Sequence, residues 1–483
     1  MILLKFFTLG VLSALVFPPF FMMPLGLIIF PYLIKLLLDV SIKKNFLNFF
    51  SYGFFYGFGF LLIFLSWIHN PFLTNEETKN FAILALILPI FLSLFYGLGF
   101  SIYKYINKIF YIIILTPLIF LLIEFFISNL FYGFPWVTYS LILSNNVMGF
   151  YLLKFFGTYA SGYLLLFIYI LPVIFIYSRK LEFKKIFIFI VHTPFLISVI
   201  LLLILNLNKT EESKKISLEL FQILLPINKA DKNSIEKEII NKINNSDAEY
   251  LVFAENNYPY LISDTSTISI VKHIKDNQKV IIGSTRIDNN KFYNSFLFLE
   301  KNNIQIFDKQ ILVPFGEFLP FRKYLKFMEK ITGNTDFTSG SNKRLVNTND
   351  INILPIICYE IIFNKILQNI NENQIDILIN VTNDSWFGEK IGPYQHFYHS
   401  RIRALISNKY LVRVSNNGIS AIIDNNGKII RSSKLNTKTS LRNILKIRNT
   451  IYYEYAHNFF IFYLILIIFI YTYFIKYKSR YEK

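Results

Sequence analysis

Residues 351–360 read INILPIICYE, an apolar run that leads to Cys358, the only cysteine of the 483-residue chain. β-Branched residues favour strands, and a continuous apolar run of this length indicates a strand buried on both faces. Cys358 is therefore expected at the end of a buried strand. It can be a small core hydrophobe, the usual fate of a free cysteine, or a nucleophile whose partners lie elsewhere in the sequence.

Short strand-like runs of the same kind recur throughout residues 208–458. Strands that alternate with helices indicate an α/β domain with layered sheets. The helical patterns cover residues 234–245, 263–277, 361–373 and 393–408. DNNGK at 424–428 predicts the turn of a hairpin.

The remainder of the chain has the composition of a membrane protein. Hydrophobic residues make up 54% of the sequence, with 53 phenylalanines. A spanning helix needs about 20 mainly apolar residues. The predicted spans are 3–18, 21–40, 50–68, 81–103, 109–130, 157–178, 186–207 and 459–475. The sequence thus predicts a polytopic helical membrane protein (1–207), an inserted α/β domain (208–458), and a last span with a basic tail (459–483).

Lysine and arginine residues fall on one side of these spans. By the positive-inside rule, both termini are cytoplasmic and residues 208–458 lie on the outer face. The net charge of +18 is accordingly read as a membrane orientation signal rather than as a nucleic-acid surface. The residues concerned are Lys43, Lys44, Lys104, Lys108, Arg179, Lys180, Lys184, Lys185, Lys476, Lys478, Arg480 and Lys483.

No disulfide or metal centre is predicted. A single cysteine excludes an intrachain disulfide. His396 and His399 form an H-x-x-H pair, but the sequence suggests no third ligand. The pair is expected to pack within a helix or to line a substrate pocket.

Three strand-like runs carry groups that could work with the thiol. YLVFAE ends on Glu255, IQIFDKQILVP holds Lys309 within a predicted strand, and Glu317 follows that strand. A cysteine nucleophile needs a base to remove its proton and a donor for the oxyanion. A helix predicted to begin directly after Cys358 would favour the thiol as an anion. Taken singly, these charged residues could equally be solvated surface groups.

The ordered combination of Glu, Lys and Cys resembles the nitrilase, or carbon–nitrogen hydrolase, superfamily. DKQILVPFGEFLP, ICYEI, NVTNDSWFG, GPYQHFYHSRIRAL and SNNGISAIID resemble more narrowly the apolipoprotein N-acyltransferase family. FPPF at 17–20 and GFPW at 133–136 extend this resemblance into the membrane part. One departure is Phe253 and Ala254, where the family usually has Trp-Pro.

The resemblance implies a nitrilase-like α-β-β-α sandwich without a cofactor. It implies that Glu255 is the general base, Lys309 stabilises the tetrahedral intermediate, and Cys358 is the nucleophile. Four residues are expected in supporting roles: Glu317, Tyr359, Glu360 and Asn294.

The same resemblance implies the substrates and the location. The acyl donor is a membrane phospholipid and the acceptor is a diacylglyceryl apolipoprotein, at the outer face of a bacterial inner membrane. FLPFRKYLKFMEK at 318–330 suits a membrane interface, with a helix packed on the sheet as the alternative. Expected lipid contacts are Trp386, Phe318, Phe321 and Trp136, with interfacial anchoring as the alternative for the two tryptophans.

Two other functions remain open from the residues alone. A membrane-tethered amidase acting on a small amide would use the same three catalytic groups. A transporter with an outer binding domain is disfavoured, because ion-coupled carriers usually place charges within their spans and these spans have almost none in their middles.

Overall fold

The structure is a computed structural model that describes residues 1–40, 45–74, 76–106, 109–176, 213–226, 231–329, 333–341, 344–367 and 374–448. These residues form two compact units. The first holds residues 1–63 and 90–176, and the second holds residues 64–89 together with 213–448. Residues 64–89 thus group with the α/β part, although they include the end of the span predicted over 50–68 and the start of the span predicted over 81–103.

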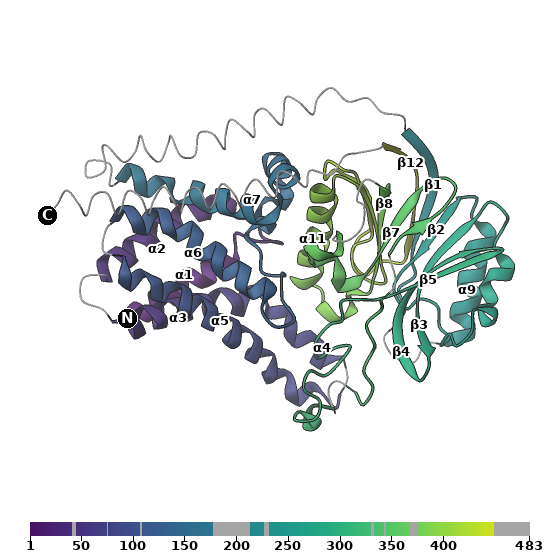
Figure 1. Cartoon of the computed structure of the whole chain (residues 1–483), viewed down its shortest axis with the longest axis horizontal. Coiled ribbons are helices and arrows are strands. Elements are labelled where there is room, and N and C mark those ends of the chain that lie inside the picture. The colour runs from purple at the N-terminus through teal and green to yellow at the C-terminus, as the bar shows by residue number, and fades with distance from the viewer. Residues whose placement is uncertain are drawn as a thin grey trace. The chain divides into compact units, whose positions relative to one another are not determined.

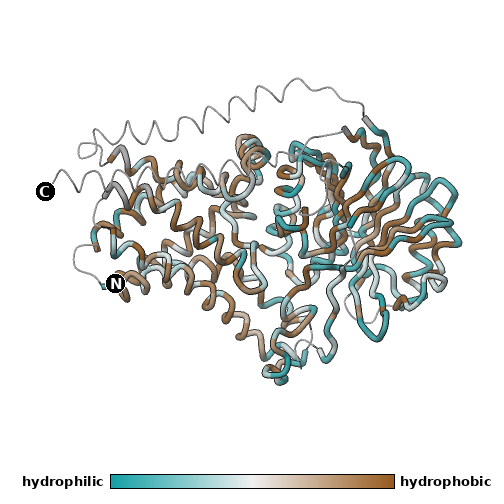
Figure 2. Tube along the Cα trace, viewed as in Figure 1, coloured by the Kyte–Doolittle hydropathy of each residue, from teal (hydrophilic) through white to brown (hydrophobic). Residues whose placement is uncertain are grey.

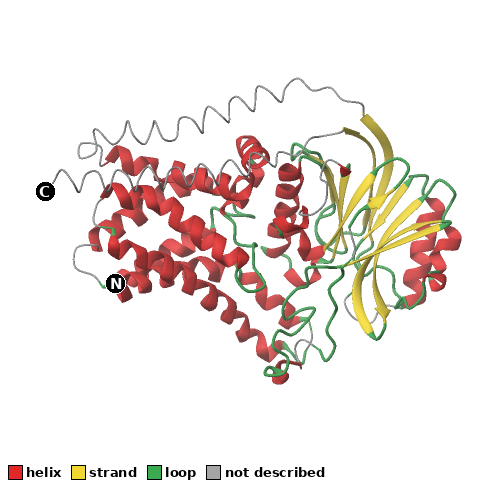
Figure 3. Cartoon of the chain, viewed as in Figure 1, coloured by secondary structure: helices red, strands yellow, loops and turns green. Residues whose placement is uncertain are grey.

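In the described part of the first unit, all regular secondary structure is helical (Figure 3). Its α-helices are α1 (Ile2–Ala14), α2 (Gly26–Val40), α3 (Phe46–Phe64), α5 (Ile87–Ser101), α6 (Ile109–Asn129) and α7 (Val147–Ile176). The last residue of α3 and the first three of α5 belong to the second unit.

Apolar residues dominate these helices (Figure 2). Four described segments are long and apolar enough to cross a membrane: Met23–Val40, Phe46–Phe64, Lys79–Tyr105 and Val147–Val173. The helix predicted over 3–18 stops at Ala14, so it is shorter than a span requires. The predicted spans 186–207 and 459–475 lie outside the described residues, as do most of the basic residues used for orientation.

The second unit is built on two six-stranded sheets. The first sheet has the order β12-β1-β2-β3-β4-β5 and the second has the order β11-β10-β9-β8-β7-β6. The first sheet comprises β1 (Ser213–Gln222), β2 (Tyr250–Phe253), β3 (Lys279–Asp288), β4 (Lys291–Glu300), β5 (Asn303–Asp308) and β12 (Thr439–Arg448). The second comprises β6 (Val346–Asn347), β7 (Asn352–Ile357), β8 (Ile377–Thr382), β9 (Tyr410–Ser415), β10 (Ala421–Ile423) and β11 (Ile429–Ser432).

The sheets face each other and a helix covers each outer face (Figure 1). One apolar core joins side chains of both sheets, including Leu218 and Ile353. A second core lies between the first sheet and α9 (Lys232–Asn245), whose Ile235, Ile239 and Ile243 recur at helical spacing. α11 (Gly392–Ser407) covers the second sheet. The predicted α-β-β-α sandwich is confirmed.

Strand direction decides where the polar residues gather. β2 runs parallel to β3, β4 runs antiparallel to β3, and β5 runs antiparallel to β4. β2 and β5 therefore point the same way, and their last residues reach the same edge of the sheet. In the second sheet β7, β8 and β9 are mutually parallel, so their ends also share one edge.

Two helix predictions are confirmed and two are wrong. Helices match the patterns at 234–245 and 393–408, and the hairpin turn at 424–428 joins β10 to β11. The pattern at 263–277 forms only the 3₁₀ segments Thr265–Thr267 and Ser269–His273. The pattern at 361–373 forms, where described, the 3₁₀ segments Cys358–Ile362 and Asn364–Leu367. A helical pattern of residues does not by itself produce an α-helix in these stretches, because short helices depend on tertiary packing rather than on propensity.

Candidate active site

Glu255, Lys309 and Cys358 each lie just beyond the end of a strand. Glu255 follows β2 after one residue, Lys309 follows β5 directly, and Cys358 follows β7 directly. Lys309 was predicted within a strand, but β5 ends at Asp308. The backbone N–H of Lys309 still donates to the carbonyl oxygen of Asn294 on β4, at 2.8 Å. Its side chain is thereby fixed at the edge of the sheet that Glu255 also occupies.

A glycine allows the Glu255 segment to cross this edge closely. A Cβ atom on Gly283 would lie 2.6 Å from the Cα of Glu255 and 2.6 Å from the backbone nitrogen of Asn256. Real Cβ atoms do not approach backbone this closely. Gly283 therefore lets the chain turn tightly after β2 and bring the carboxyl group over β3 and β4.

A buried ammonium group lies between two carboxyl groups. The Nζ of Lys309 is 2.8 Å from Oε1 of Glu317 and 3.9 Å from Oε1 of Glu255, and the Lys309 side chain is 1% exposed. The amide nitrogen of Asn294 donates to Oε1 of Glu255 at 2.7 Å and to Oε1 of Glu317 at 2.9 Å. Because carboxylates only accept hydrogen bonds, these two contacts fix the orientation of the Asn294 amide.

Burial and neighbouring charges shift the pKa values of Glu255 and Lys309. Burial raises the pKa of Glu255, Lys309 opposes that rise, and the like charge of Glu317 adds to it. Burial alone would lower the pKa of Lys309, but Glu317, Cys358 and Glu255 together hold that pKa above its ordinary value. The cluster therefore pairs a carboxylate of raised basicity with an ammonium that stays charged.

Cys358 adopts a left-handed backbone conformation, with φ of 49°. A non-glycine residue in this region costs roughly 1–3 kcal/mol and persists only where its surroundings hold it. The thiol is buried, and Glu255 and Lys309 lie close enough to act on its pKa. A strained, buried sulfur next to a carboxylate is the arrangement of a nucleophile beside its base.

The anion that a helix beginning directly after Cys358 would have favoured is not supported. Burial raises the pKa of the Cys358 thiol, and Glu255 raises it further, with only partial opposition from Lys309. A five-residue 3₁₀ segment, Cys358–Ile362, replaces the helix that was expected to favour the anion. The thiol is therefore neutral at rest, so a base has to remove its proton during attack.

Glu360 anchors the chain on both sides of the site. Its carboxylate accepts backbone N–H groups from Gln310 at 2.7 Å, Ile311 at 3.0 Å and Ile357 at 2.9 Å. It also forms a buried ion pair with Arg344, with Nη1 to Oε2 at 2.7 Å. Burial opposes ionisation, but Arg344 and the backbone donors hold the pKa of Glu360 below its ordinary value. Glu360 therefore ties the segment after Lys309 to the strand before Cys358.

Tyr359 has a buried ring that contacts Phe363 edge-on, with ring centroids 5.1 Å apart. Its backbone N–H lies in the first turn of the 3₁₀ segment, where backbone donors lack partners within the segment. This N–H is therefore available to a group that approaches the sulfur.

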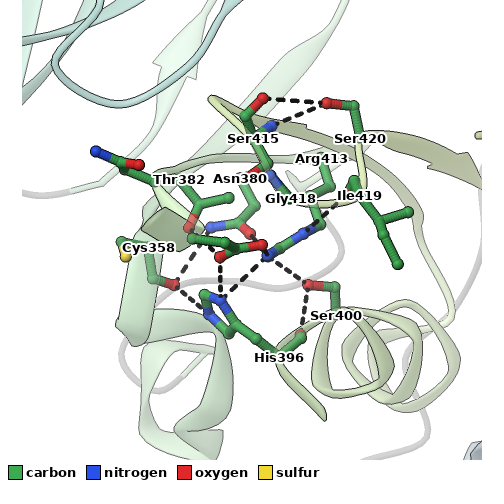
Figure 4. A network of polar contacts seen from close by, with 12 residues as sticks. Cys358, Asn380, Thr382, His396, Ser400, Arg413, Ser415, Gly418, Ile419 and Ser420 are labelled. Carbon is green, nitrogen blue, oxygen red and sulfur yellow. Dashed lines mark hydrogen bonds and ion pairs between the residues drawn. The ribbon is translucent and has the colours of Figure 1, made fainter. Parts of the chain in front are cut away.

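Sequence reasoning missed a polar network beneath Cys358 (Figure 4). Asn380 on β8, Arg413 on β9, His396 on α11 and Asp384 after β8 are each 0% exposed. Asp384 lies within the NDSWFG motif and His396 within the H-x-x-H pair. The sequence therefore pointed to both residues, but not to the buried network that they form. Within the described residues no cluster of three or more His, Cys, Asp or Glu could hold a metal ion.

The residues expected to meet lipid differ in exposure. Trp386 is 43% exposed and Phe321 is 70% exposed, whereas Phe318 is half-buried. Trp136 is 0% exposed and stacks on Phe134, with ring centroids 6.2 Å apart. Its expected contact with lipid is therefore corrected to packing inside the helical unit.

The segment 318–330 is not a helix packed on the sheet. Its described part consists of turns and the 3₁₀ segment Lys326–Met328. Phe321 and Tyr324 project outward, while Arg322 bonds to Asp336 and Glu329. Exposed aromatic rings on a loop held by ion pairs agree better with the predicted membrane interface than with the helical alternative.

Profiles of two protein families match the chain in order. The apolipoprotein N-acyltransferase N-terminal domain matches residues 9–171. The carbon-nitrogen hydrolase family matches residues 238–450. The two matches correspond to the helical unit and to the sandwich.

Curated relatives match over most of the chain. The apolipoprotein N-acyltransferase of Rickettsia typhi is 30% identical over 457 residues, which covers 89% of this chain and 89% of the relative. The protein of the same name from Wigglesworthia glossinidia brevipalpis is 30% identical over 461 residues, covering 88% and 89%. Among solved structures, a Saccharomyces cerevisiae member of branch 10 of the nitrilase superfamily aligns with 17% identity and a TM-score of 0.39. That alignment covers 49% of this chain and 92% of the yeast protein.

Proposed function

The chain belongs to the apolipoprotein N-acyltransferase family, and from this premise we propose a transfer that passes through a thioester on Cys358. A fatty acyl chain leaves a membrane phospholipid and reaches the free α-amine of the N-terminal diacylglyceryl-cysteine of a lipoprotein. The observation that carries this proposal is the placement of Cys358, Glu255 and Lys309 at one buried site, where Glu255 and Lys309 both act on the pKa of the thiol.

The first half-reaction loads the cysteine. Glu255 takes the thiol proton as the sulfur attacks the ester carbonyl carbon, and the carbonyl oxygen becomes an oxyanion. Lys309 stabilises this oxyanion together with the Tyr359 N–H. As the tetrahedral intermediate collapses, the ester C–O bond breaks and the leaving lysophospholipid oxygen receives the proton from Glu255.

The second half-reaction unloads it. The α-amine attacks the thioester carbonyl, the C–S bond breaks and an amide forms. Glu255 takes a proton from the amine nitrogen and returns it to the sulfur. Glu317 and Asn294 keep their hydrogen bonds throughout and hold Lys309 and Glu255 in place. The reaction is therefore of the ping-pong type.

The same proposal assigns the chain to a membrane location. Residues 1–207 and 459–483 span the inner membrane, and residues 208–458 form the catalytic domain on its outer face. Four apolar helices long enough to cross a bilayer and the exposed ring of Phe321 support this assignment.

Mass spectrometry tests the function directly. A lipoprotein N-terminus isolated with the active protein should carry a third acyl chain, and one isolated without it should carry two. Incubation with phospholipid alone should add one acyl mass to the protein, and neutral hydroxylamine should remove it. Since Cys358 is the only cysteine, the adduct needs no mapping. An acylated or active Cys358→Ala protein would refute the thioester.

A further inference from the structure

Two buried side chains meet the backbone carbonyl of the nucleophile (Figure 4). The Nε2 of His396 lies 3.3 Å from the carbonyl oxygen of Cys358, and the Nδ2 of Asn380 lies 3.5 Å from it. Asn380 also donates to the carbonyl of Ile356 at 3.3 Å. The mechanism above uses none of these contacts.

An ion pair holds both side chains from behind. Arg413 donates to Oδ2 of Asp384 at 2.7 Å and to Oδ1 of Asn380 at 2.7 Å. The Nδ1 of His396 lies 2.8 Å from Oδ1 of Asp384 and 3.1 Å from Nη2 of Arg413. Phe387 packs edge-on against the imidazole, with ring centroids 5.1 Å apart. These contacts restrain the positions of the His396 and Asn380 side chains.

The contacts of the imidazole indicate where its proton lies. The Cys358 carbonyl only accepts, so a hydrogen bond from Nε2 needs the proton on Nε2; a neutral ring with that proton accepts from Arg413 at Nδ1, and the nearby Asp384 oxygen is then not its hydrogen-bond partner. A doubly protonated ring would donate from Nδ1 to Asp384 and from Nε2 to the carbonyl. In both states Nε2–H donates to Cys358, and only the neutral ring protonated on Nδ1 loses this bond.

Planarity transmits this anchor to the next residue. The carbonyl of Cys358 and the N–H of Tyr359 belong to one peptide unit and point in opposite directions when the bond is trans. Holding the carbonyl toward His396 and Asn380 therefore turns the Tyr359 N–H to the opposite side. It also maintains the left-handed conformation of Cys358, which needs external support.

We propose that His396, Asn380 and the Asp384–Arg413 pair are positioning residues that anchor the peptide between Cys358 and Tyr359. They fix the thiol beside Glu255 and aim the Tyr359 N–H at the oxyanion. They act through the backbone, and the inference rests on the proposed thioester mechanism. A purely structural role would lower stability without depending on which nitrogen of residue 396 donates.

Two substitutions of one residue separate these roles. His396→Gln keeps a donor near the position of Nε2, facing the Cys358 carbonyl. His396→Asn keeps a donor near the position of Nδ1, facing Asp384. Both are neutral, polar and smaller than histidine. His399→Gln, three residues away on α11, is the matched control.

The readout is single-turnover acylation of the full-length protein by phospholipid in detergent, followed by intact mass. We expect His396→Asn to load about 10²-fold more slowly, as for loss of an oxyanion donor, and His396→Gln within about tenfold of wild type. The phospholipid KM should not change in either variant, and His399→Gln should load normally. Equal rates for His396→Gln and His396→Asn, whether fast or slow, would overturn the inference.

Labelling of Cys358 by a thiol dye in native buffer reports folding. If His396→Asn exposes the thiol, Asn380→Ser, which deletes the other donor to the same carbonyl, takes its place with the same expected loss. An unimpaired Asn380→Ser would then overturn the inference. A wild-type protein that forms no thioester would instead refute the proposed function, and the inference with it.

Discussion

The indole N–H of Trp67 donates to Oε1 of Gln395 at 3.0 Å, although 328 positions separate the two residues. Gln395 in turn donates to the carbonyl of Phe64 at 3.0 Å, and the Trp67 ring meets Phe387 edge-on at 4.8 Å. The segment that follows α3 is thereby built into the α/β unit. Phe387 also contacts His396, so this segment adjoins the network beneath Cys358.

Removing the Trp67 ring should destabilise this unit. Trp67 is 8% exposed, and truncation of a buried tryptophan costs about 3–5 kcal/mol. We expect Trp67→Ala to lower the temperature at which a thiol dye gains access to Cys358 in detergent. Trp386→Ala, at a residue 43% exposed, should change it far less. Equal losses in the two variants would show that Trp67 does not anchor the segment.

Glu360→Gln should cost both stability and loading. The substitution leaves the buried Arg344 guanidinium without a counter-charge, a loss of about 3–5 kcal/mol. Replacing both partners, as Arg344→Met with Glu360→Gln, should recover part of the stability, as urea unfolding would measure. Loading should stay slow in the double variant, because a glutamine amide has a single acceptor oxygen and cannot accept from Gln310 and Ile311 on one side and from Ile357 on the other. Normal loading there would limit Glu360 to a role in folding.

Lys309 should not tolerate arginine. The ammonium fits between Glu317 and Glu255 as a compact charge, whereas a guanidinium is a planar fork. We expect Lys309→Arg and Lys309→Met to slow single-turnover loading by about 10²-fold or more. Near-normal loading in either variant would mean that another group stabilises the oxyanion.

The pH dependence of loading should report the raised pKa of Glu255. A base works only when deprotonated, so the rate should fall as the pH falls through that pKa. Because burial raises it above the ordinary value of 4.5, the acid limb should lie at higher pH than for a solvated glutamate. Removing a like charge, as in Glu317→Gln, should shift the limb to lower pH. A limb at or below the ordinary value in the wild type would argue against Glu255 as the base.

Reporter fusions test the proposed topology. Fusions after Lys44, Lys185 and Lys483 should report the cytoplasm, and a fusion near Asn303 should report the outer side. A cytoplasmic signal at Asn303 would contradict lipid transfer at the outer face together with the topology.

The sequence by itself determined the classes of structure and the residues proposed to react. The strand before Cys358 was recognisable because a strand buried on both faces reads as one apolar run. The apolar helices were recognisable because a bilayer sets their length and composition. The order of Glu255, Lys309 and Cys358 is also visible in the sequence, because each lies within or directly after a strand-like run.

Only the tertiary structure decided how these groups are held. The short 3₁₀ segment at Cys358, the end of β5 before Lys309 and the burial of Trp136 follow from packing against distant elements, which local periodicity does not encode. The network of Asp384, His396 and Arg413 is the clearest case. A buried charge is tolerable only with its partner at hydrogen-bonding distance, and that distance is set by the register of β8 on β9 and by the packing of α11. Residues far apart in the chain carry no local mark of such a pairing, so their role became visible only when the fold brought them together.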